Sequence, residues 1–555
     1  MKPYCLLLFS TVFLLTTLLV NSASSSSPDL DSNLSAIKSL CKSTPHADAC
    51  LDSLKLSVSI SLNPDILSFL LHSLEAAVSE AGKLSTLFSN SHSSIVEKQK
   101  GTLQDCSELH QITLSSLKKS LSKISSSSNS RQLTDARAFL SAALTNKATC
   151  LEGLNSASGS SKPSLINSIN YSYKYVTNAL SLLSQNKQSG DTTTTTSTSA
   201  KSSKINGKIH RRLMGFPSWI SAKDRRILEG SDGEEEDDAG NNGLTVAADG
   251  TGDFTTINDA INSAPNNSAD RIIIYVKQGI YQENVEIPSW KPNIVLIGDG
   301  SDVTTITGSR SVADGWTTFR SATLAVSGEG FLARDIKIEN TAGPEKGQAV
   351  ALRINADLAA VYRCTIKGYQ DTLYVHSFRQ FYRECDIYGT IDYIFGNAAV
   401  VLQGCNVISR LPLPGQSTVI TAQSRDDPNE LTGISLQNCS ILPTVDLDDN
   451  AGSVKSYLGR PWRNFSTVVV MESYIDEHIA PEGWTPWSQD DVDSLSTLYY
   501  GEYNNNGPGS GTDNRVGWPG YHVMSYDDAS TFTVSYFITG DEWLDSTSFP
   551  YDNGV

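Results

Sequence analysis

The sequence predicts two architectures in one chain: an all-α four-helix bundle in residues 28–186, then an all-β right-handed parallel β-helix in residues 244–555. In the first part apolar residues recur at helical spacing, as in ILSFLLHSLEAAVSEAGKLSTLF, and aromatic residues are few. In the second part Gln348, Asp371 and Asp392 lie 23 and 21 residues apart. A period in the low twenties, carried by short β-branched runs, is typical of a solenoid.

Residues 1–23 have the features of a secretory signal peptide. Lys2 precedes an apolar run over residues 5–20, which is short for a membrane span and is followed by small residues. A membrane anchor is the alternative. No later segment is apolar enough to span a membrane, so we expect no stable membrane association. Secretion would permit N-glycans at the N-x-S sequons, which begin at Asn33, Asn170, Asn266, Asn438 and Asn464.

Residues 187–243 read as a linker, because DTTTTTSTSAKSSK offers too little apolar surface to fold. Two arginine pairs, each followed by an aliphatic residue, predict cleavage by a subtilisin-like processing protease. These pairs are Arg211-Arg212 and Arg225-Arg226. The alternative is that a long linker collects basic residues for solubility.

Charge is divided unevenly along the chain. Residues 1–230 contain 24 Lys and Arg against 15 Asp and Glu, whereas residues 231–555 contain 19 against 45. The strong excess of acidic residues in the C-terminal half argues against a nucleic-acid partner. The opposite signs predict electrostatic attraction between the two halves.

From residue 271 onward, short β-branched runs such as RIIIYVKQGIY and NIVLIGDG alternate with Gly, Asn and Asp turns. No helical pattern intervenes, which favours stacked coils over a doubly wound sheet. Cys364, Cys385 and Cys405 follow the same period, 21 and 20 residues apart, which places neighbours within disulfide reach. In the bundle four cysteines allow three pairings: Cys41, Cys50, Cys106 and Cys150.

The repeat brings two carboxylates, Asp371 and Asp392, and two amides, Gln348 and Gln370, to one face. Two acids one coil apart cannot both ionise freely, so one pKa rises while the other stays low. Arg460 is a natural partner for the ionised acid. For an ester substrate the ionised acid serves as nucleophile and the protonated one as general acid, while the amides stabilise the oxyanion.

Other chemistries find less support. No G-x-S-x-G motif occurs, and His376, His478 and His522 are expected to be structural or exposed. The acidic clusters 426–430, 446–449 and 490–493 lack an ordered ligand pattern, so we expect solvated loops and neither metal nor cofactor, with a calcium site as the alternative.

A retaining glycosidase would also suit a close carboxylate pair. The paired amides favour the esterase, because an oxocarbenium-like transition state has no oxyanion to stabilise. A carbohydrate-binding or inhibitory protein that has lost activity is the non-enzyme alternative. In either enzyme Trp462 and Trp484 are candidates for contact with a sugar face.

From residue 244 the chain contains, in this order, the motifs LTVAADGTGDFTTINDAI, GIYQE, QAVAL, YQDTLY, DYIFG and LGRPW. In these motifs and in their order the chain resembles plant pectin methylesterases. The layout of the bundle's cysteines resembles plant invertase and pectin methylesterase inhibitor domains. One departure from the usual family form is Tyr393 in DYIFG, where Phe is usual. It keeps the ring, and we expect activity to survive.

The resemblance implies a role for each site residue. Asp392 attacks the C6 carbonyl, Asp371 protonates methanol and then activates water, and Gln370 and Gln348 hold the oxyanion. Arg460 orients Asp392. Thr318 is a further substrate contact.

The resemblance also implies the disulfides Cys41–Cys50, Cys106–Cys150 and Cys385–Cys405, and leaves Cys364 and Cys439 unassigned. It implies a secreted precursor that acts on cell-wall pectin, cut between the halves to release the mature enzyme. The bundle would inhibit its own catalytic half, as separate inhibitor proteins do. A stabilising pro-segment without inhibitory activity is the alternative.

Overall fold

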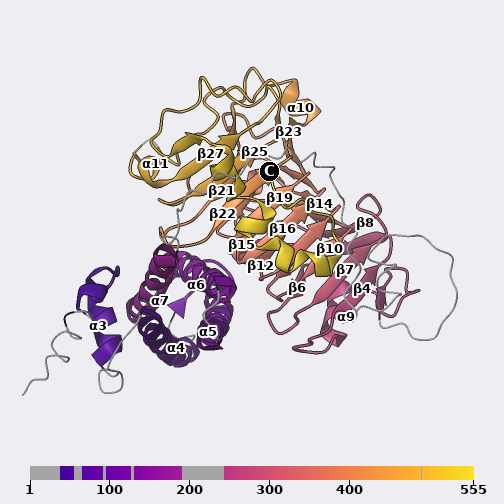
Figure 1. Ribbon diagram of the computed structural model, residues 1–555. Helices are drawn as coiled ribbons and strands as arrows, with labels where there is room; N and C mark the ends of the chain where they lie inside the picture. Colours follow the sequence, from indigo (N-terminus) through magenta and orange to yellow (C-terminus); the bar gives the residue numbers. More distant parts are fainter. Residues whose placement is uncertain are drawn as a thin grey trace, which may run out of the picture.

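The computed structural model describes residues 35, 38–55, 66–91, 95–126, 130–190, 243–488 and 490–555. The signal-peptide prediction, the two dibasic sites and Asn33 lie outside these residues. A helical bundle lies beside an elongated stack of strands (Figure 1). No described helix is long and apolar enough to cross a membrane.

The bundle is built from four long helices that pack on one another around an apolar core rich in Leu and Ala. The helices are α4 (Ile66–Ser91), α5 (Thr102–Ser126), α6 (Ser130–Ser156) and α7 (Lys162–Gly190), with the short α3 (Ala47–Lys55) packed against α4 and α7. A two-strand sheet of β1 (Ile95–Val96) and β2 (Ser158–Gly159) joins two of the connections. The structure confirms the disulfides Cys41–Cys50 and Cys106–Cys150, the second of which ties α5 to α6.

The second part is a parallel β-helix whose coils contribute strands to three sheets. The long sheet contains β3 (Leu244–Val246), β4 (Ile272–Val276), β7 (Ile294–Gly298), β10 (Leu332–Arg334), β13 (Ala359–Tyr362), β16 (Arg379–Arg383), β19 (Ala399–Gln403), β22 (Gly433–Gln437), β25 (Thr467–Met471), β27 (Tyr499–Tyr503) and β28 (Tyr521–Val523). The third sheet contains β5 (Gly279–Gln282), β8 (Thr304–Gly308), β11 (Lys337–Asn340), β14 (Thr365–Lys367), β17 (Asp386–Gly389), β20 (Asn406–Ser409), β23 (Ser440–Pro443) and β26 (Tyr474–Ile475). The site sheet, which carries the predicted site, contains β6 (Val285–Ile287), β9 (Leu324–Val326), β12 (Leu352–Asn355), β15 (Leu373–Ser377), β18 (Ile394–Gly396), β21 (Thr418–Gln423) and β24 (Ser456–Gly459).

Alternation of side chains along these short strands fills the interior. Leu352, Leu373 and Ile394 pair in register along the site sheet and point into one apolar core, each 0% exposed. Short helices decorate the coils: α9 (Ile257–Ser263), α10 (Val445–Asp448), α11 (Ser494–Thr497), α12 (Tyr526–Ser530) and α13 (Val534–Phe537), with 3-10 turns η1 (Phe319–Ser321), η2 (Pro344–Lys346), η3 (Gly540–Glu542) and η4 (Leu544–Thr547). The last of these segments cover the outer face of the long sheet through Val534, Phe537 and Leu544 (Figure 1).

The predicted disulfide Cys385–Cys405 is wrong, because both residues are free, as are Cys364 and Cys439. The four thiols stack one per coil directly before β14, β17, β20 and β23. The Cys385 and Cys405 side chains are in hydrogen-bonding contact but are not covalently joined. The Cys385 Sγ also lies 3.5 Å from the carbonyl oxygen of Val361 and 3.4 Å from that of Arg383, and its single S–H can donate to one of them.

The bundle covers the site sheet. Helix α6 contacts β15, and the Lys100 N–H donates to the carbonyl oxygen of Gly315 at 2.7 Å. The two parts share one apolar cluster, in which Phe319, Tyr374 and Phe395 of the solenoid pack with the bundle's leucines. The site sheet is therefore buried on its outer face as well as its inner one.

Candidate active site

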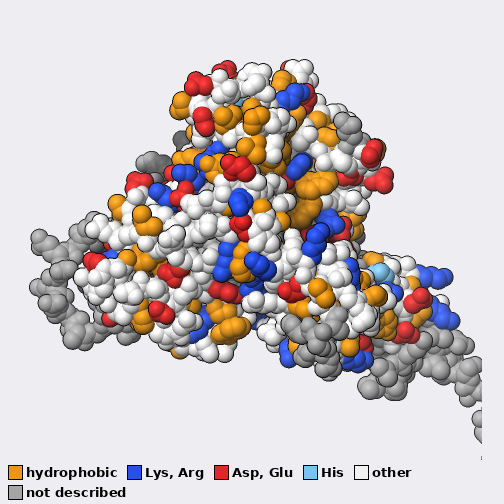
Figure 2. Space-filling view, turned by 180° about the vertical axis from the view of Figure 1, so that it is seen from behind, with side chains coloured by type: hydrophobic (Ala, Val, Ile, Leu, Met, Phe, Trp, Pro, Cys, Tyr) orange, Lys and Arg blue, Asp and Glu red, His pale blue; other side chains and the backbone are white. Residues whose placement is uncertain are grey.

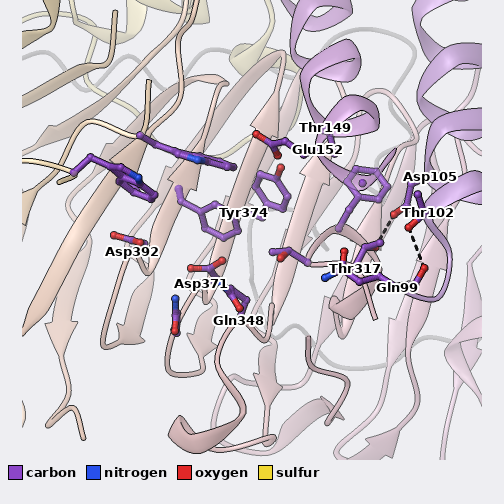
Figure 3. A pocket seen from close by; sticks show the side chains of 18 of the residues that line it. Gln99, Thr102, Asp105, Thr149, Glu152, Thr317, Gln348, Asp371, Tyr374 and Asp392 are labelled. Carbon is purple, nitrogen blue, oxygen red and sulfur yellow. Dashed lines mark hydrogen bonds between the residues drawn. The ribbon is translucent and has the colours of Figure 1, made fainter. Parts of the chain in front are cut away.

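A cavity of about 290 Å³ lies between the bundle and the site sheet (Figure 3). The solenoid lines it with all the residues expected to do chemistry: Gln348, Gln370, Asp371, Asp392 and Arg460. Thr318 and Trp462 line it too. The bundle closes the cavity from above with residues of α5 and α6 and of the preceding loop: Gln99, Thr102, Asp105, Thr149, Glu152 and Gly153.

The coil geometry places the acids opposite each other. Asp371 and Asp392 each precede a strand of the site sheet by two residues, and the Asp371 N–H donates to the carbonyl oxygen of Ile391 at 3.0 Å. Both have positive φ, 63° and 51°, a left-handed conformation uncommon outside glycine and often found at functional sites. The tight turn before each strand thus presents a carboxylate to the cavity.

The amides pair in the same way, with one difference from the simple repeat. The Ala349 N–H donates to the carbonyl oxygen of Gln370 at 3.2 Å, which sets Gln348 opposite Gln370 and not below Asp371. Gln348 is therefore paired with Gln370, 22 residues further on, and not with Asp371, 23 residues further on. The site consists of an acid pair and an amide pair on neighbouring positions of the coil.

Arg460 holds one acid of the pair. Its Nε and Nη2 donate to Asp392 Oδ1 and Oδ2 at 2.8 and 2.6 Å, a bidentate arrangement that favours the carboxylate. Burial raises the pKa of Asp392 nevertheless, and Arg460 counteracts this rise. Burial and the neighbouring Asp392 raise the pKa of Asp371 well above 3.8, with Arg460 opposing. Of the two acids, Asp371 is therefore the one more strongly favoured as carboxyl, and Asp392 the one that Arg460 favours as carboxylate.

An aromatic row follows the acid pair along the cavity. The rings of Tyr374 and Phe395 stack at 4.1 Å, and Phe395 lies 6.0 Å from Trp462. Trp462 in turn stacks with Trp487 at 6.3 Å, and the Arg460 guanidinium lies 4.4 Å from the Trp487 ring. Such faces suit the apolar side of a sugar ring.

Trp484 is not part of this row. It is 1% exposed in the solenoid core, and its Nε1–H donates to Glu502 at 3.1 Å. Trp487, three residues further on, lines the cavity instead, so the prediction that Trp484 contacts a sugar face is wrong. Tyr374 and Phe395 were also missed, although they lie 21 residues apart within YQDTLY and DYIFG, the period that revealed the acids.

The remaining expectations concern metals, histidines and glycans. Among the described residues no group of three or more His, Cys, Asp or Glu side chains is arranged to hold a metal ion. None of the three histidines lines the cavity, and buried His376 hydrogen-bonds to Thr149 of the bundle at 2.9 Å. The four described sequon asparagines are exposed, and their glycosylation stays a prediction: Asn170, Asn266, Asn438 and Asn464.

The charges that join the bundle to the solenoid have the opposite sign from that expected of the two halves. The bundle contributes the acids of the buried pairs and the solenoid the arginines: Asp105 and Glu108 with Arg320, and Asp135 with Arg379. The half-exposed pair of Glu152 with Arg463 has the same direction. More exposed pairs, Lys119 with Glu329 and Arg131 with Glu542, run the other way. Acidic and basic side chains are interspersed on the face shown in Figure 2. Net charge therefore does not describe the local contact.

Fold and site together define a class of protein, a solenoid hydrolase whose carboxylate pair lies on one sheet of a parallel β-helix. Comparison with known families places the chain within that class. Residues 243–541 match the family model described as Pectinesterase, and residues 35–182 match the model described as Plant invertase/pectin methylesterase inhibitor. The chain belongs to the pectinesterase family, which are carboxylic ester hydrolases, and has an inhibitor-like N-terminal domain.

The names of two relatives combine pectinesterase with pectinesterase inhibitor. The chain is 63% identical over 95% of both chains to "Probable pectinesterase/pectinesterase inhibitor 12" of Arabidopsis thaliana. It is 46% identical to "Pectinesterase/pectinesterase inhibitor" of Ficus pumila var. awkeotsang, with 82% of this chain and 81% of that protein covered. The chain is also similar to the solved structure of pectin methylesterase from carrot, with 51% sequence identity and a TM-score of 0.56. The match covers 58% of this chain and 100% of the carrot chain.

Proposed function

We propose that this protein hydrolyses the C6 methyl esters of pectin, with Asp392 as nucleophile and Asp371 as acid and base. The observation that carries this assignment is the asymmetry of the acid pair. Arg460 holds Asp392 by two hydrogen bonds, while burial and the adjacent charge raise the pKa of Asp371. One acid is thereby kept as carboxylate and its neighbour as carboxyl.

The reaction follows from these protonation states. The Asp392 carboxylate adds to the ester carbonyl carbon, and the oxyanion accepts N–H bonds from the Gln348 and Gln370 side chains. The C–O bond to methanol then breaks as Asp371 gives the leaving oxygen its proton. Asp371, now ionised, takes a proton from water, whose oxygen attacks the acyl group bound to Asp392 and releases the free galacturonate.

Substrate contacts are proposed for the aromatic row and for two polar groups. Trp462 and Trp487 support sugar rings on the side of Arg460, and Tyr374 and Phe395 do so beside the acids. The two polar groups are Arg460 and Thr318, which both line the cavity. Pectin is the substrate that the family relationship favours.

We further propose that the bundle keeps the enzyme silent until the linker is cut. The cavity that holds the acid pair is closed by α5 and α6, and Glu152 and Thr149 reach into it (Figure 3). A tether also raises the effective concentration of the bundle. Secretion to the cell wall, cleavage by a subtilisin-like protease at the dibasic sites, and recognition by separate inhibitor proteins complete this proposal.

One assay tests the reaction class. Chain cut in the linker and freed of the bundle is incubated with methyl-esterified pectin without added metal, and methanol and new reducing ends are measured together. We expect methanol without reducing ends. Formation of reducing ends at a comparable rate would instead support a galacturonan hydrolase, the other use of a close carboxylate pair.

A further inference from the structure

Two arginines of the solenoid lie under α5, in contact with Asp105 and Phe319, which line the cavity. Arg353 of β12 is 0% exposed, and its Nη2 lies 3.9 Å from Glu108 Oε1 of the bundle. Its Nε and Nη1 are buried without a hydrogen-bond partner among the described residues. Its guanidinium stacks 3.4 Å from the Phe319 ring centroid. A buried guanidinium with unpaired N–H groups is costly and demands an acceptor.

Arg320 of η1 is the second member. Its Nε donates to Asp105 Oδ1 at 2.6 Å, its Nη2 to Glu108, and its Nη1 to Glu286 Oε1 at 2.9 Å. Asp105 and Glu108 belong to the bundle, whereas Glu286 belongs to the solenoid and its side chain is 46% exposed. When the bundle leaves, Glu286 is the one carboxylate of these three that remains for the two guanidinium groups, and it is half solvated.

Both arginines are neighbours of residues that line the cavity. Arg353 pairs in register with Tyr374, which pairs with Phe395, so Arg353 continues the aromatic row one coil further, at a strand spacing of about 4.8 Å. Thr318 and Phe319, immediately before Arg320, line the cavity. A chain of sugars lying along the row would therefore reach the two arginines.

We propose that Arg320 and Arg353 form a subsite for the free carboxylate of a galacturonate near the ester that reacts, and that bundle acids fill this subsite in the precursor. The inference rests on the proposed function and deepens it by naming the charge state of a neighbouring sugar. Forked guanidinium groups match a carboxylate in shape and charge. Each turnover produces such a carboxylate, so the product of one reaction would help to position the next ester.

The other side of the cleft has mixed charge. A cavity of about 350 Å³ next to Trp462 is lined by Asp426, Asp427 and Glu430 and also by Arg463. Burial raises the pKa of Glu430 to about 8, so this carboxyl adds no full negative charge at neutral pH. A uronate carboxylate is therefore attracted most strongly at the end with Arg320 and Arg353. A partly de-esterified chain would thus bind in one preferred orientation.

The test uses full-length protein with a site-specific protease sequence inserted in residues 191–204, cut after folding and freed of the bundle. Arg320→Gln and Arg353→Gln are compared with Arg363→Gln, an arginine 44% exposed that pairs with Asp335 outside the cavity. The readouts are the Kd of an unesterified oligogalacturonate and kcat/KM for methanol release on half-esterified and on fully esterified homogalacturonan.

We expect each subsite variant to lose about tenfold to a hundredfold in oligogalacturonate affinity, the range for a charge-assisted hydrogen bond, and more kcat/KM on the half-esterified substrate than on the fully esterified one. Arg363→Gln should change neither. If folded Arg320→Gln binds the oligogalacturonate as tightly as the parent and keeps the parent's preference between the two substrates, the subsite proposal is overturned. Because the buried Arg353→Gln variant can fail to fold, the result for Arg320→Gln is the decisive one. Weakened binding in protein that releases no methanol from any substrate would sink the proposed function and leave the subsite standing.

Discussion

Glu108 offers the sharpest test of the closed precursor. Its carboxylate lies between Arg320 and Arg353 and accepts a hydrogen bond from Ser327 Oγ at 2.9 Å. Burial acts to raise its pKa, but the two arginines hold it below 4.5, so the closed state favours the charged form. Glu108→Gln keeps the shape of the side chain and removes the charge that these buried guanidinium groups face.

The size of the effect follows from the burial of the pair. Removing one partner of a buried ion pair costs about 3–5 kcal/mol because it leaves the other charge uncompensated. At about 1.4 kcal/mol per decade, the lower figure shifts the equilibrium between closed and open precursor about a hundredfold toward open. Methanol release by uncut precursor should rise by up to that factor, limited by the rate of the mature enzyme.

The assay uses precursor in which all four linker arginines are alanine, so that no cleavage occurs, and follows methanol at neutral pH. Lys119→Gln is the matched control, because its pair with Glu329 is 45% and 39% exposed and is worth about 1 kcal/mol or less. Equal rates for the Glu108→Gln and parent precursors, with the cut enzyme much faster than both, would show that this cluster does not close the cleft. Equal rates for cut and uncut parent protein would refute silencing altogether.

Four further outcomes are expected. Asp392→Asn in the cut enzyme should reduce methanol release to background because an amide is a far poorer nucleophile; substantial remaining activity would show that the nucleophile is another group. Gln370→Ala should lower kcat about 10²–10³-fold with little change in KM, and a loss seen mainly in KM would contradict an oxyanion role. Burial, partly offset by Arg320, raises the pKa of Asp105 from 3.8 to about 6 in the closed state. Asp105 therefore favours closure fully below pH 3.8, and this contribution is lost as pH rises through 6. The pKa of Glu108 is lowered instead, so its contribution is lost as pH falls below 4.5. Leakage of methanol from uncut precursor should therefore increase from pH 5 to pH 7, and a flat profile in the parent, or one unchanged by Asp105→Asn, would contradict this. Thiol titration of protein without residues 1–23 should find four thiols, which react only after unfolding. A count of two thiols would instead support a disulfide between neighbouring coils.

The fold and the acid pair could be predicted because residues on the same face of successive coils of a solenoid recur at a nearly constant spacing in the sequence. Asp371 and Asp392 are 21 residues apart, which is also the spacing of Leu373 and Ile394 in the ladder. The bundle's disulfides were available through resemblance. Gln348 shows the limit of spacing: one extra residue relative to the strand pairing moves it opposite Gln370, and only backbone hydrogen bonds reveal this.

Features that depend on which way a side chain faces, or on a few local contacts, could not be read in this way. Trp484 and Trp487 are three residues apart, and the turn between them sends one into the core and the other to the cavity. The predicted attraction between the halves used net charge, but the buried contacts pair bundle acids such as Glu108 with solenoid arginines such as Arg320. Net charge sums many solvated residues, whereas a docked interface is determined by the few that lose water.

The apolar cluster shared by bundle and solenoid has a consequence for the behaviour of the protein in solution. Phe319, Tyr374 and Phe395 are 2–3% exposed only because helices lie on them. Once the helices depart, this strip becomes wetted surface, the kind of patch that draws molecules of one kind together when nothing else occupies it. Polysaccharide in the surroundings would then act as a solubiliser as well as a substrate. If the linker is cut only after export, as proposed above, the precursor can be concentrated during its synthesis and transport with the strip covered, and the strip would be exposed only where sugar chains are abundant.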